Sequence, residues 1–190
     1  MAWYVIDGID GSGKTTAGEM LTGILESEGR KVLKIEHPNR DTMVGRAEAK
    51  FLTVDGKPAK IISTLLYIAD VVRSVRFMKC RGSRYDDIVF IRYIMSVAYL
   101  SDKPAQAAYK LFSRILPTPD VKILIDVDEN VAVSRIAARG DELESFEVPE
   151  KLGKIRQRMR GLADGWHVVD NSGDPSDAES ALRDIVGRSD

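Results

Sequence analysis

Residues 5–16, VIDGIDGSGKTT, are the stretch that decides the fold. Gly8, Gly13, Lys14 and Thr15 stand at the spacing G-x-x-x-x-G-K-[ST], which is that of the phosphate-binding loop, or P-loop. An apolar run at residues 3–6 precedes the loop, and apolar residues at helical spacing follow it. Strand, glycine turn and helix therefore come in the order that a P-loop needs. A tight glycine turn that holds nothing is the weaker alternative.

The residue types in this loop fit the binding of a triphosphate. Glycines such as Gly11 let the main chain come close to phosphate, because they have no Cβ. Successive N–H groups can then form an anion nest at the positive end of the following helix. Lys14 can reach the β- and γ-phosphates, and the Thr15 hydroxyl can ligate Mg²⁺. The loop predicts a protein that binds a nucleoside triphosphate.

Composition narrows the class of protein further. The chain has 190 residues, of which 44% are hydrophobic and 30% charged, so we expect one globular domain over residues 1–190. Its 28 basic and 29 acidic residues give a net charge of −1, which offers no bulk attraction to nucleic acid or to a membrane. No apolar run reaches the length of about 18 residues that spans a bilayer. No signal segment precedes the first strand, and we expect a cytoplasmic protein.

Strand-like and helix-like segments alternate along the whole chain. Short apolar runs predict strands at residues 3–6, 31–35, 88–91, 121–125 and 166–169. Helices are expected at about 14–27, 59–80, 93–99, 104–116, 128–139, 149–162 and 176–186. This order predicts the α/β class: a three-layer P-loop NTPase fold, whose five-stranded and mainly parallel sheet has helices on both faces.

A P-loop alone does not distinguish a kinase from a GTPase, a motor or a ligand-gated switch, and phosphoryl transfer makes further demands on the chain. Such a reaction needs cations that neutralise the transferred group, and Arg92, Arg135 and Arg139 are placed to supply them. For Arg135 and Arg139 the alternative is a cation favoured by the helix dipole. Glu36 begins the segment that follows the second strand, at the strand end where open α/β sheets place their ligands.

Two candidate insertions lie outside the expected core of strands and helices, at residues 36–59 and in the acidic loop at 141–149. A small-molecule kinase needs a site for the phosphoryl acceptor and a lid that excludes water. Residues of about 36–80 are the candidate acceptor region. Residues of about 139–149, which include an acidic loop, are the candidate lid.

Residues 8–16, GIDGSGKTT, resemble the loop of thymidylate kinases, including the acid at Asp10. Further similarities follow in the same order along almost the whole chain. LLYIAD at 65–70 resembles the family's L-L-F-A-A-D helix. Arg92-Tyr93, with Ser96 and Ala98-Tyr99, resembles its D-R-Y…S…A-Y segment. ILIDV at 123–127, with Val131-Ala132 and Arg135-Ile136, resembles its fourth strand and the helix before the lid. Phe146-Glu147 resembles the end of the lid motif.

The resemblance implies an ATP- and Mg²⁺-dependent nucleoside monophosphate kinase that converts dTMP to dTDP. It implies that ATP is bound by Gly8, Asp10, Gly11, Ser12, Gly13, Lys14, Thr15, Thr16 and Arg135, with Thr15 on the metal and with Lys14, Arg92 and Arg139 as catalytic groups. The acceptor would contact Asp10, Glu36, Tyr67, Arg92 and Tyr99.

Four of these acceptor contacts have an expected role. Asp10 would meet the 3′-hydroxyl, and Arg92 would bind the acceptor phosphate. Tyr67 would stack on the base, and Tyr99 would favour deoxyribose. A place in the hydrophobic core is the alternative for both tyrosines.

The chain departs from the family pattern on the acceptor side. Ile91 replaces the acid before Arg-Tyr, with Asp7 or Asp126 as candidates to substitute for it, and Val71 replaces an arginine. The segment EHPNR at 36–40 stands where the family has R-E-P-G-G-T, and Glu144-Ser145 stands for the lid's Asp-Arg. Two other functions therefore stay open: a kinase of a different phosphorylated acceptor, or a related protein that binds ATP for regulation.

The resemblance also implies a homodimer. Its interface would use the helix from residue 59 and the helix near Tyr99. Burial of these helices within one subunit is the alternative.

Overall fold

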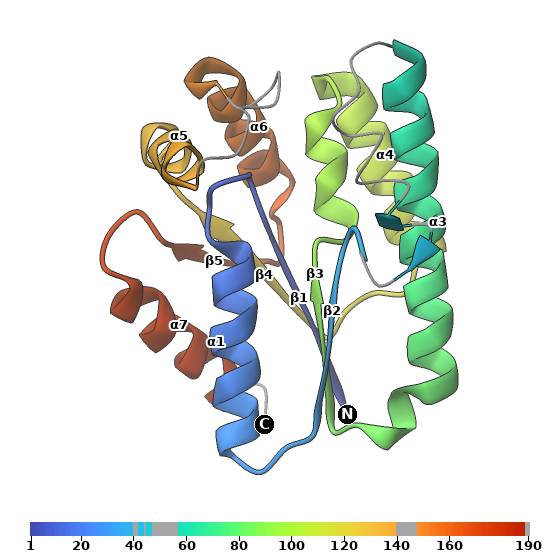
Figure 1. Ribbon diagram of the computed structural model, residues 1–190, viewed down its shortest axis with the longest axis vertical. Coiled ribbons are helices and arrows are strands. Elements are labelled where there is room, and N and C mark those ends of the chain that lie inside the picture. Colours follow the sequence, from blue (N-terminus) through green and yellow to red (C-terminus); the bar gives the residue numbers. More distant parts are fainter. Residues whose placement is uncertain (40–41, 44, 47–56, 140–147, 189–190) are drawn as a thin grey trace.

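A five-stranded parallel sheet forms the centre of the protein in the computed structural model, which describes residues 1–39, 42–43, 45–46, 57–139 and 148–188 (Figure 1). The strands are β1 (Ala2–Gly8), β2 (Val32–Glu36), β3 (Asp87–Ile91), β4 (Val121–Asp126) and β5 (His167–Asp170). Their order in the sheet is β2-β3-β1-β4-β5, and the four pairings are parallel. The five predicted strands are thus confirmed, and β1 occupies the middle of the sheet.

Helices cover both faces of this sheet and make three layers (Figure 1). One face carries α1 (Lys14–Ser27) and α7 (Pro175–Gly187), while α3 (Lys57–Arg81), α4 (Asp102–Ile115), α5 (Glu129–Ala138) and α6 (Pro149–Leu162) lie on the other side. Alternation along β1 builds the two cores: Tyr4 and Ile6 pack with α1 and α7, whereas Trp3 and Val5 pack on the opposite face. The predicted three-layer α/β fold is confirmed. No helix within the described ranges is long and apolar enough to cross a membrane.

Two short 3₁₀-helices lie before and after β3, η1 (Gly82–Arg84) and η2 (Ile94–Tyr99). The sequence predicts an ordinary helix up to Tyr99, but the structure has a 3₁₀-helix there. Residues three apart eclipse each other in a 3₁₀-helix. The rows 94/97 and 95/98 are therefore both buried, while Ser96 and Tyr99 form a third, partly exposed row. That third row faces the site described below.

The carboxyl ends of the strands meet at one edge of the sheet, because all strands are parallel. Glu36 pairs in register with Ile91, Ile6 also pairs with Ile91, and Gly8 pairs with Ile125. The P-loop leaves β1 at this edge, between the ends of β3 and β4. The helix that follows it, α1, runs back along one face of the sheet (Figure 1).

The opposite end of the sheet is tied by Asp87, the first residue of β3, which is fully buried. Its Oδ1 accepts hydrogen bonds from the Ala2 backbone N–H at 3.0 Å and from Arg30 Nη2 at 2.9 Å. One carboxylate thus joins the starts of β1 and β3 to the segment that precedes β2.

We expect Asp87→Ala to lower the free energy of unfolding by about 3 kcal/mol, because it strands a buried N–H group and a largely buried guanidinium. Urea unfolding of the variant and the unaltered protein measures the difference. Glu179→Ala is the control, since Glu179 forms an exposed ion pair with Arg183, and such pairs are worth about 1 kcal/mol or less. Equal effects of the two substitutions would contradict the anchoring role of Asp87.

Candidate active site

The P-loop turn has a backbone that only glycine tolerates at two points. Gly11 and Gly13 have φ angles of 76° and 84°, in the left-handed region. A Cβ on Gly11 would lie 2.4 Å from the Ala132 carbonyl oxygen, and one on Gly13 would lie 2.6 Å from Asn171 Nδ2. Asn171 Nδ2 in turn donates to the Ser12 carbonyl oxygen at 2.8 Å. The loop is therefore closely packed against α5 and against the turn after β5.

Asp10 lies at the centre of a cluster of three predicted site residues. Its Oδ1 accepts hydrogen bonds from Lys14 Nζ at 3.0 Å and from Arg92 Nη2. Its Oδ2 accepts one from the Tyr99 hydroxyl at 2.5 Å. Lys14 Nζ also donates to the Ile9 carbonyl oxygen at 2.9 Å. The structure thus brings together Asp10, Lys14, Arg92 and Tyr99 from the P-loop, the end of β3 and η2.

The charges of this cluster are strongly coupled. Burial alone would raise the pKa of Asp10, but Lys14 and Arg92 outweigh burial and hold that pKa well below its usual range. Burial would lower the pKa of Arg92, yet Asp10 keeps it above its usual value. Burial, and then the neighbouring Arg92, lower the pKa of Lys14. Two cations share the Asp10 carboxylate, and either of them could form an ion pair with a phosphate instead.

Arg92 has an unusual backbone conformation for a residue with a side chain, with φ at 66°. Such a conformation costs about 1–3 kcal/mol and persists only where the surroundings impose it. His37 Nδ1 donates to the Arg92 carbonyl oxygen at 2.8 Å, and His37 Nε2 lies 2.9 Å from Ser74 Oγ. On the other side, the Tyr93 backbone N–H donates to Asp7 Oδ2 at 2.9 Å. Arg92 is therefore held in place by β1, β2 and α3 together.

His37 and Asn171 are supporting residues to which the sequence analysis assigned no role. His37 is fully buried. In the sequence, only its position between a strand end and Pro38 indicates that it lies near the site. Asn171 begins a turn directly after β5, which places it at the edge where strand ends meet. The contacts of both residues join segments far apart in the chain, so local patterns could not reveal them.

Asp7 is a buried carboxylate beneath the cluster, with 1% of its surface exposed. Its Oδ2 accepts hydrogen bonds from the backbone N–H groups of Tyr93 at 2.9 Å and Met95 at 3.3 Å. Among the residues that the structure describes, Oδ1 has no hydrogen-bond partner. Burial raises the pKa of Asp7 from 3.8 to about 6, although these hydrogen bonds and the charges of Lys14 and Arg92 oppose the change.

Two further residues expected at the acceptor side lie around this cluster. Tyr67 on α3 donates from its hydroxyl to the Tyr93 carbonyl oxygen, and the same hydroxyl lies 2.9 Å from Ser96 Oγ. Its ring meets the His37 ring edge to face, with centroids 6.3 Å apart. Glu36 instead contacts the P-loop helix, because Thr15 Oγ1 donates to Glu36 Oε1 at 2.9 Å.

The two arginines expected near the lid both lie on or just after α5. Arg135 on α5 has its Nη1 3.9 Å from the point that a Cβ on Gly13 would occupy, so its guanidinium is beside the P-loop. Arg139 follows the last turn of α5 and is exposed. Residues 140–147, which contain most of the expected lid with its Phe146-Glu147, lie outside the described residues, as do Arg40 and much of the segment after it.

The two apolar residues that depart from the family pattern lie in the interior of the protein. Val71 is 3% exposed and Ile91 is fully buried, so both belong to the hydrophobic core. The basic row of Arg73, Arg76 and Lys79 on α3 is exposed to solvent.

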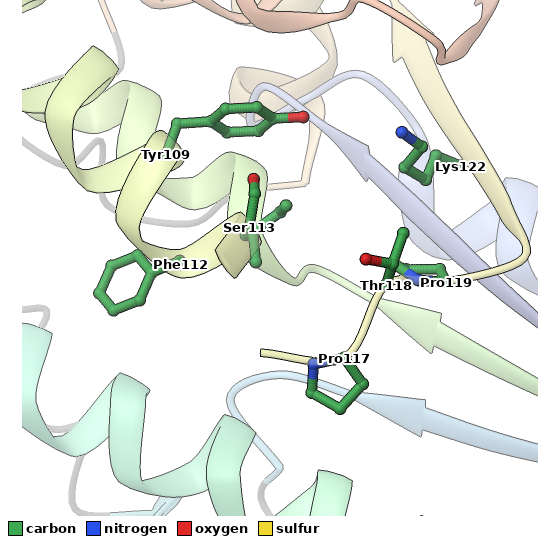
Figure 2. Close-up of a pocket in the computed structure, with 8 residues that line it drawn as sticks. Tyr109, Phe112, Ser113, Pro117, Thr118, Pro119 and Lys122 are labelled. Atoms are coloured by element: carbon green, nitrogen blue, oxygen red, sulfur yellow. The ribbon is translucent and has the colours of Figure 1, made fainter. Parts of the chain in front are cut away.

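A small pocket elsewhere in the molecule is unsuited to a nucleotide. It has a volume of about 50 Å³ and lies between the end of α4 and the start of β4, where the Tyr109 hydroxyl and the Lys122 amine point toward one another (Figure 2). Ligand pockets of drug size have about 300–1,000 Å³. Lys122 is the second residue of β4, so the pocket is at the opposite end of this strand from the P-loop. A groove of about 500 Å³ between α4 and α6 likewise contains none of the predicted site residues.

A glycine-rich loop joins the central parallel strand to a helix, which defines a P-loop nucleotide-binding fold. An arginine and a lysine contact one carboxylate in this loop. A family model described as thymidylate kinase matches residues 6–182. The chain belongs to the thymidylate kinase family, which confirms the resemblance noted in its sequence.

Individual relatives agree with this assignment. A probable thymidylate kinase of Pyrobaculum aerophilum is 28% identical over 193 residues, covering 99% of this chain and 97% of the relative. A thymidylate kinase of Xanthomonas oryzae pv. oryzae is 34% identical over 183 residues, covering 94% and 78%. Among solved structures, the thymidylate kinase of Candida albicans has the same fold, with a TM-score of 0.74 at 20% identity, and the match covers 98% of this chain and 91% of that one.

We expect Asp7→Asn to change how stability depends on pH. In the unaltered protein Asp7 has a pKa of 3.8 when unfolded and of about 6 when folded, so the folded state binds more protons between these values. The free energy of unfolding therefore falls as pH rises through this window, by roughly 3 kcal/mol in total. The amide of the variant would keep an oxygen that accepts both N–H groups but would not titrate.

Urea unfolding of both proteins at several pH values between 4 and 8 measures this difference. The variant should gain stability relative to the unaltered protein as pH rises from about 4 to 6, and the gain should level off above that range. A difference that stays constant across the whole range would contradict the raised pKa of Asp7.

Proposed function

We propose that this protein is an ATP- and Mg²⁺-dependent nucleoside monophosphate kinase that transfers the γ-phosphoryl group to dTMP and forms dTDP. The observation that carries the proposal is the shared carboxylate of Asp10. It places Lys14, which the P-loop pattern assigns to the ATP phosphates, next to Arg92, the candidate cation for the acceptor phosphate. Membership of the thymidylate kinase family supports dTMP as the acceptor.

The donor side of the proposed site is the P-loop. Its N–H groups and the positive end of α1 would hold the ATP phosphates. Lys14 would exchange its bonds to Asp10 and to the Ile9 carbonyl oxygen for the β- and γ-phosphates, with Arg135 beside the loop as a further cation. Mg²⁺, held by the Thr15 hydroxyl, would neutralise charge on the phosphates when bound.

The acceptor side would use the other half of the cluster. Arg92 would bind the acceptor phosphate from its rigid position, and Asp10 would accept a hydrogen bond from the sugar 3′-hydroxyl. Tyr99, which already contacts Asp10, would leave room for deoxyribose only, and Tyr67 would pack against the base. Such a site acts through positioning and charge stabilisation, since phosphoryl transfer asks for little covalent chemistry from the protein.

The proposed unit is one kinase domain of residues 1–190, with an acceptor region of about 36–80 and a lid of about 139–149 that brings Arg139 to the phosphates. We also propose a cytoplasmic location, where nucleotide substrates are found, and a homodimer. The dimer is supported by the surface of α3, on which Ile62, Leu65 and Phe77 are exposed apolar residues.

An acceptor panel tests the reaction itself. We expect purified protein with ATP and Mg²⁺ to release ADP fastest with dTMP, compared with dUMP, dCMP, dAMP, dGMP and UMP. Lys14→Ala should reduce the rate by about 100-fold or more, because Lys14 would stabilise the transferred phosphoryl group. A faster rate with another acceptor would favour a different kinase. ATP binding without ADP release would favour the regulatory alternative.

Arg92→Ala tests the assignment of the acceptor phosphate. Loss of a charged hydrogen bond costs about 1.5–3 kcal/mol, so the KM for dTMP should rise by about 10- to 100-fold. ATP affinity, measured by calorimetry, should stay near its original value, because Lys14 and the P-loop remain. Arg76→Ala on the exposed face of α3 is the matched control and should change neither constant. Parallel losses of ATP and dTMP affinity would contradict the assignment.

A further inference from the structure

The Mg²⁺ site of a P-loop protein needs a carboxylate besides the loop's hydroxyl. In the P-loop NTPases this carboxylate is an aspartate that acts together with the Ser or Thr of the loop. Here β3, the strand beside β1, ends in Ile91, which is fully buried. Its Cδ1 lies 2.5 Å from the position that a Cβ on Gly18 of α1 would take. The end of β3 therefore presents an apolar side chain to α1.

Asp7 and Asp126, the two acids that the sequence offered as substitutes, face away from α1. Asp7 accepts the N–H groups of Tyr93 and Met95, on the face of the sheet that carries η2. Asp126 is bound by Arg156 of α6 through two hydrogen bonds of 2.8 and 2.9 Å. Side chains alternate between the faces of a strand, so neither carboxylate is directed at the Thr15 hydroxyl.

Glu36 is on the correct face and in contact with the loop. It is the last residue of β2 and pairs in register with Ile91. Residues that pair across two strands point to the same face of the sheet, so Glu36 faces α1 as Ile91 does. Its longer side chain reaches Thr15, whose Oγ1 donates to Glu36 Oε1 at 2.9 Å. The Glu36 side chain is exposed and accessible to an ion.

We propose that Glu36 is the carboxylate of the Mg²⁺ site and supplies from β2 the charge that β3 lacks. By accepting the hydrogen bond that the Thr15 hydroxyl donates, Glu36 would leave the lone pairs of Oγ1 free for the ion. One carboxylate is enough, because Mg²⁺ is usually held by one or two carboxylates together with phosphates and water. In the described ranges no group of three or more His, Cys, Asp or Glu residues could hold a metal, which fits such a sparse site.

The position of Glu36 also predicts a preference between two forms of ATP. Without metal, its negative charge would repel the triphosphate. With metal, the same charge would attract the ion that the triphosphate carries. Glu36 would thus select the metal complex of ATP over free ATP. This inference rests on the proposed binding of ATP at the P-loop.

Glu36→Gln tests the inference, because the amide can still accept the Thr15 hydrogen bond but carries no charge. The probe is Mn²⁺, followed by its electron paramagnetic resonance signal, with a non-hydrolysable ATP analogue. We expect Mn²⁺ to bind the protein–analogue complex roughly 10- to 100-fold more weakly in the variant. The affinity for the metal-free analogue should be unchanged or higher.

Glu19→Gln is the matched control, one turn further along α1, where the side chain is 61% exposed; it should leave both affinities unchanged. If Glu36→Gln binds Mn²⁺ as the unaltered protein does, the role of Glu36 is wrong while ATP binding stands. If the variant loses affinity equally for the metal-free and the metal-loaded analogue, Glu36 only shapes the loop, and the inference is also wrong. Failure of the unaltered protein to bind the analogue would instead overturn the proposed function.

Discussion

The site depends on one buried carboxylate that compensates two cations. Lys14 and Arg92 come from different segments, and both contact Asp10, which also accepts the Tyr99 hydroxyl. Without a negative charge between them, the buried Lys14 and the partly buried Arg92 would repel each other and carry an uncompensated desolvation cost. Asp10 Oδ1 accepts hydrogen bonds from both cations. In the proposed reaction, a phosphate would compete with Asp10 for Lys14, and one anion would replace another.

The rigidity of Arg92 has a separate origin, in the backbone. Its left-handed conformation is imposed from two sides, by His37 on its carbonyl oxygen and by Asp7 on the next N–H group. Both supporting groups are buried, and removing either would leave polar partners unsatisfied in the core. The backbone thus fixes the direction in which the Arg92 side chain projects, before any ligand binds. Preorganisation of this kind reduces the conformational entropy that is lost when a ligand binds.

Local sequence patterns predicted the elements well but not their mutual orientation. The bounds of α1 and α6 agree with the prediction, since helical periodicity and flanking glycine or proline mark them. The 3₁₀ form of residues 94–99 was not predictable, because a three-residue period over six residues resembles a helix. The cluster around Asp10 could be inferred only through family resemblance. Glu36 contacts Thr15, whereas Asp7 and Asp126 both face away from α1. These orientations depend on strand order and register, which no local pattern contains.

The hydrogen bond between Asn171 and Ser12 means that the P-loop and the residue that supports it are synthesised at different times. These residues are 159 positions apart, and the central strand β1 pairs with β3 and β4, which are both synthesised long after it. The P-loop is synthesised before β3, β4 and the turn after β5, on all of which its position depends. A nascent chain therefore contains the loop sequence long before it contains the residue that supports the loop.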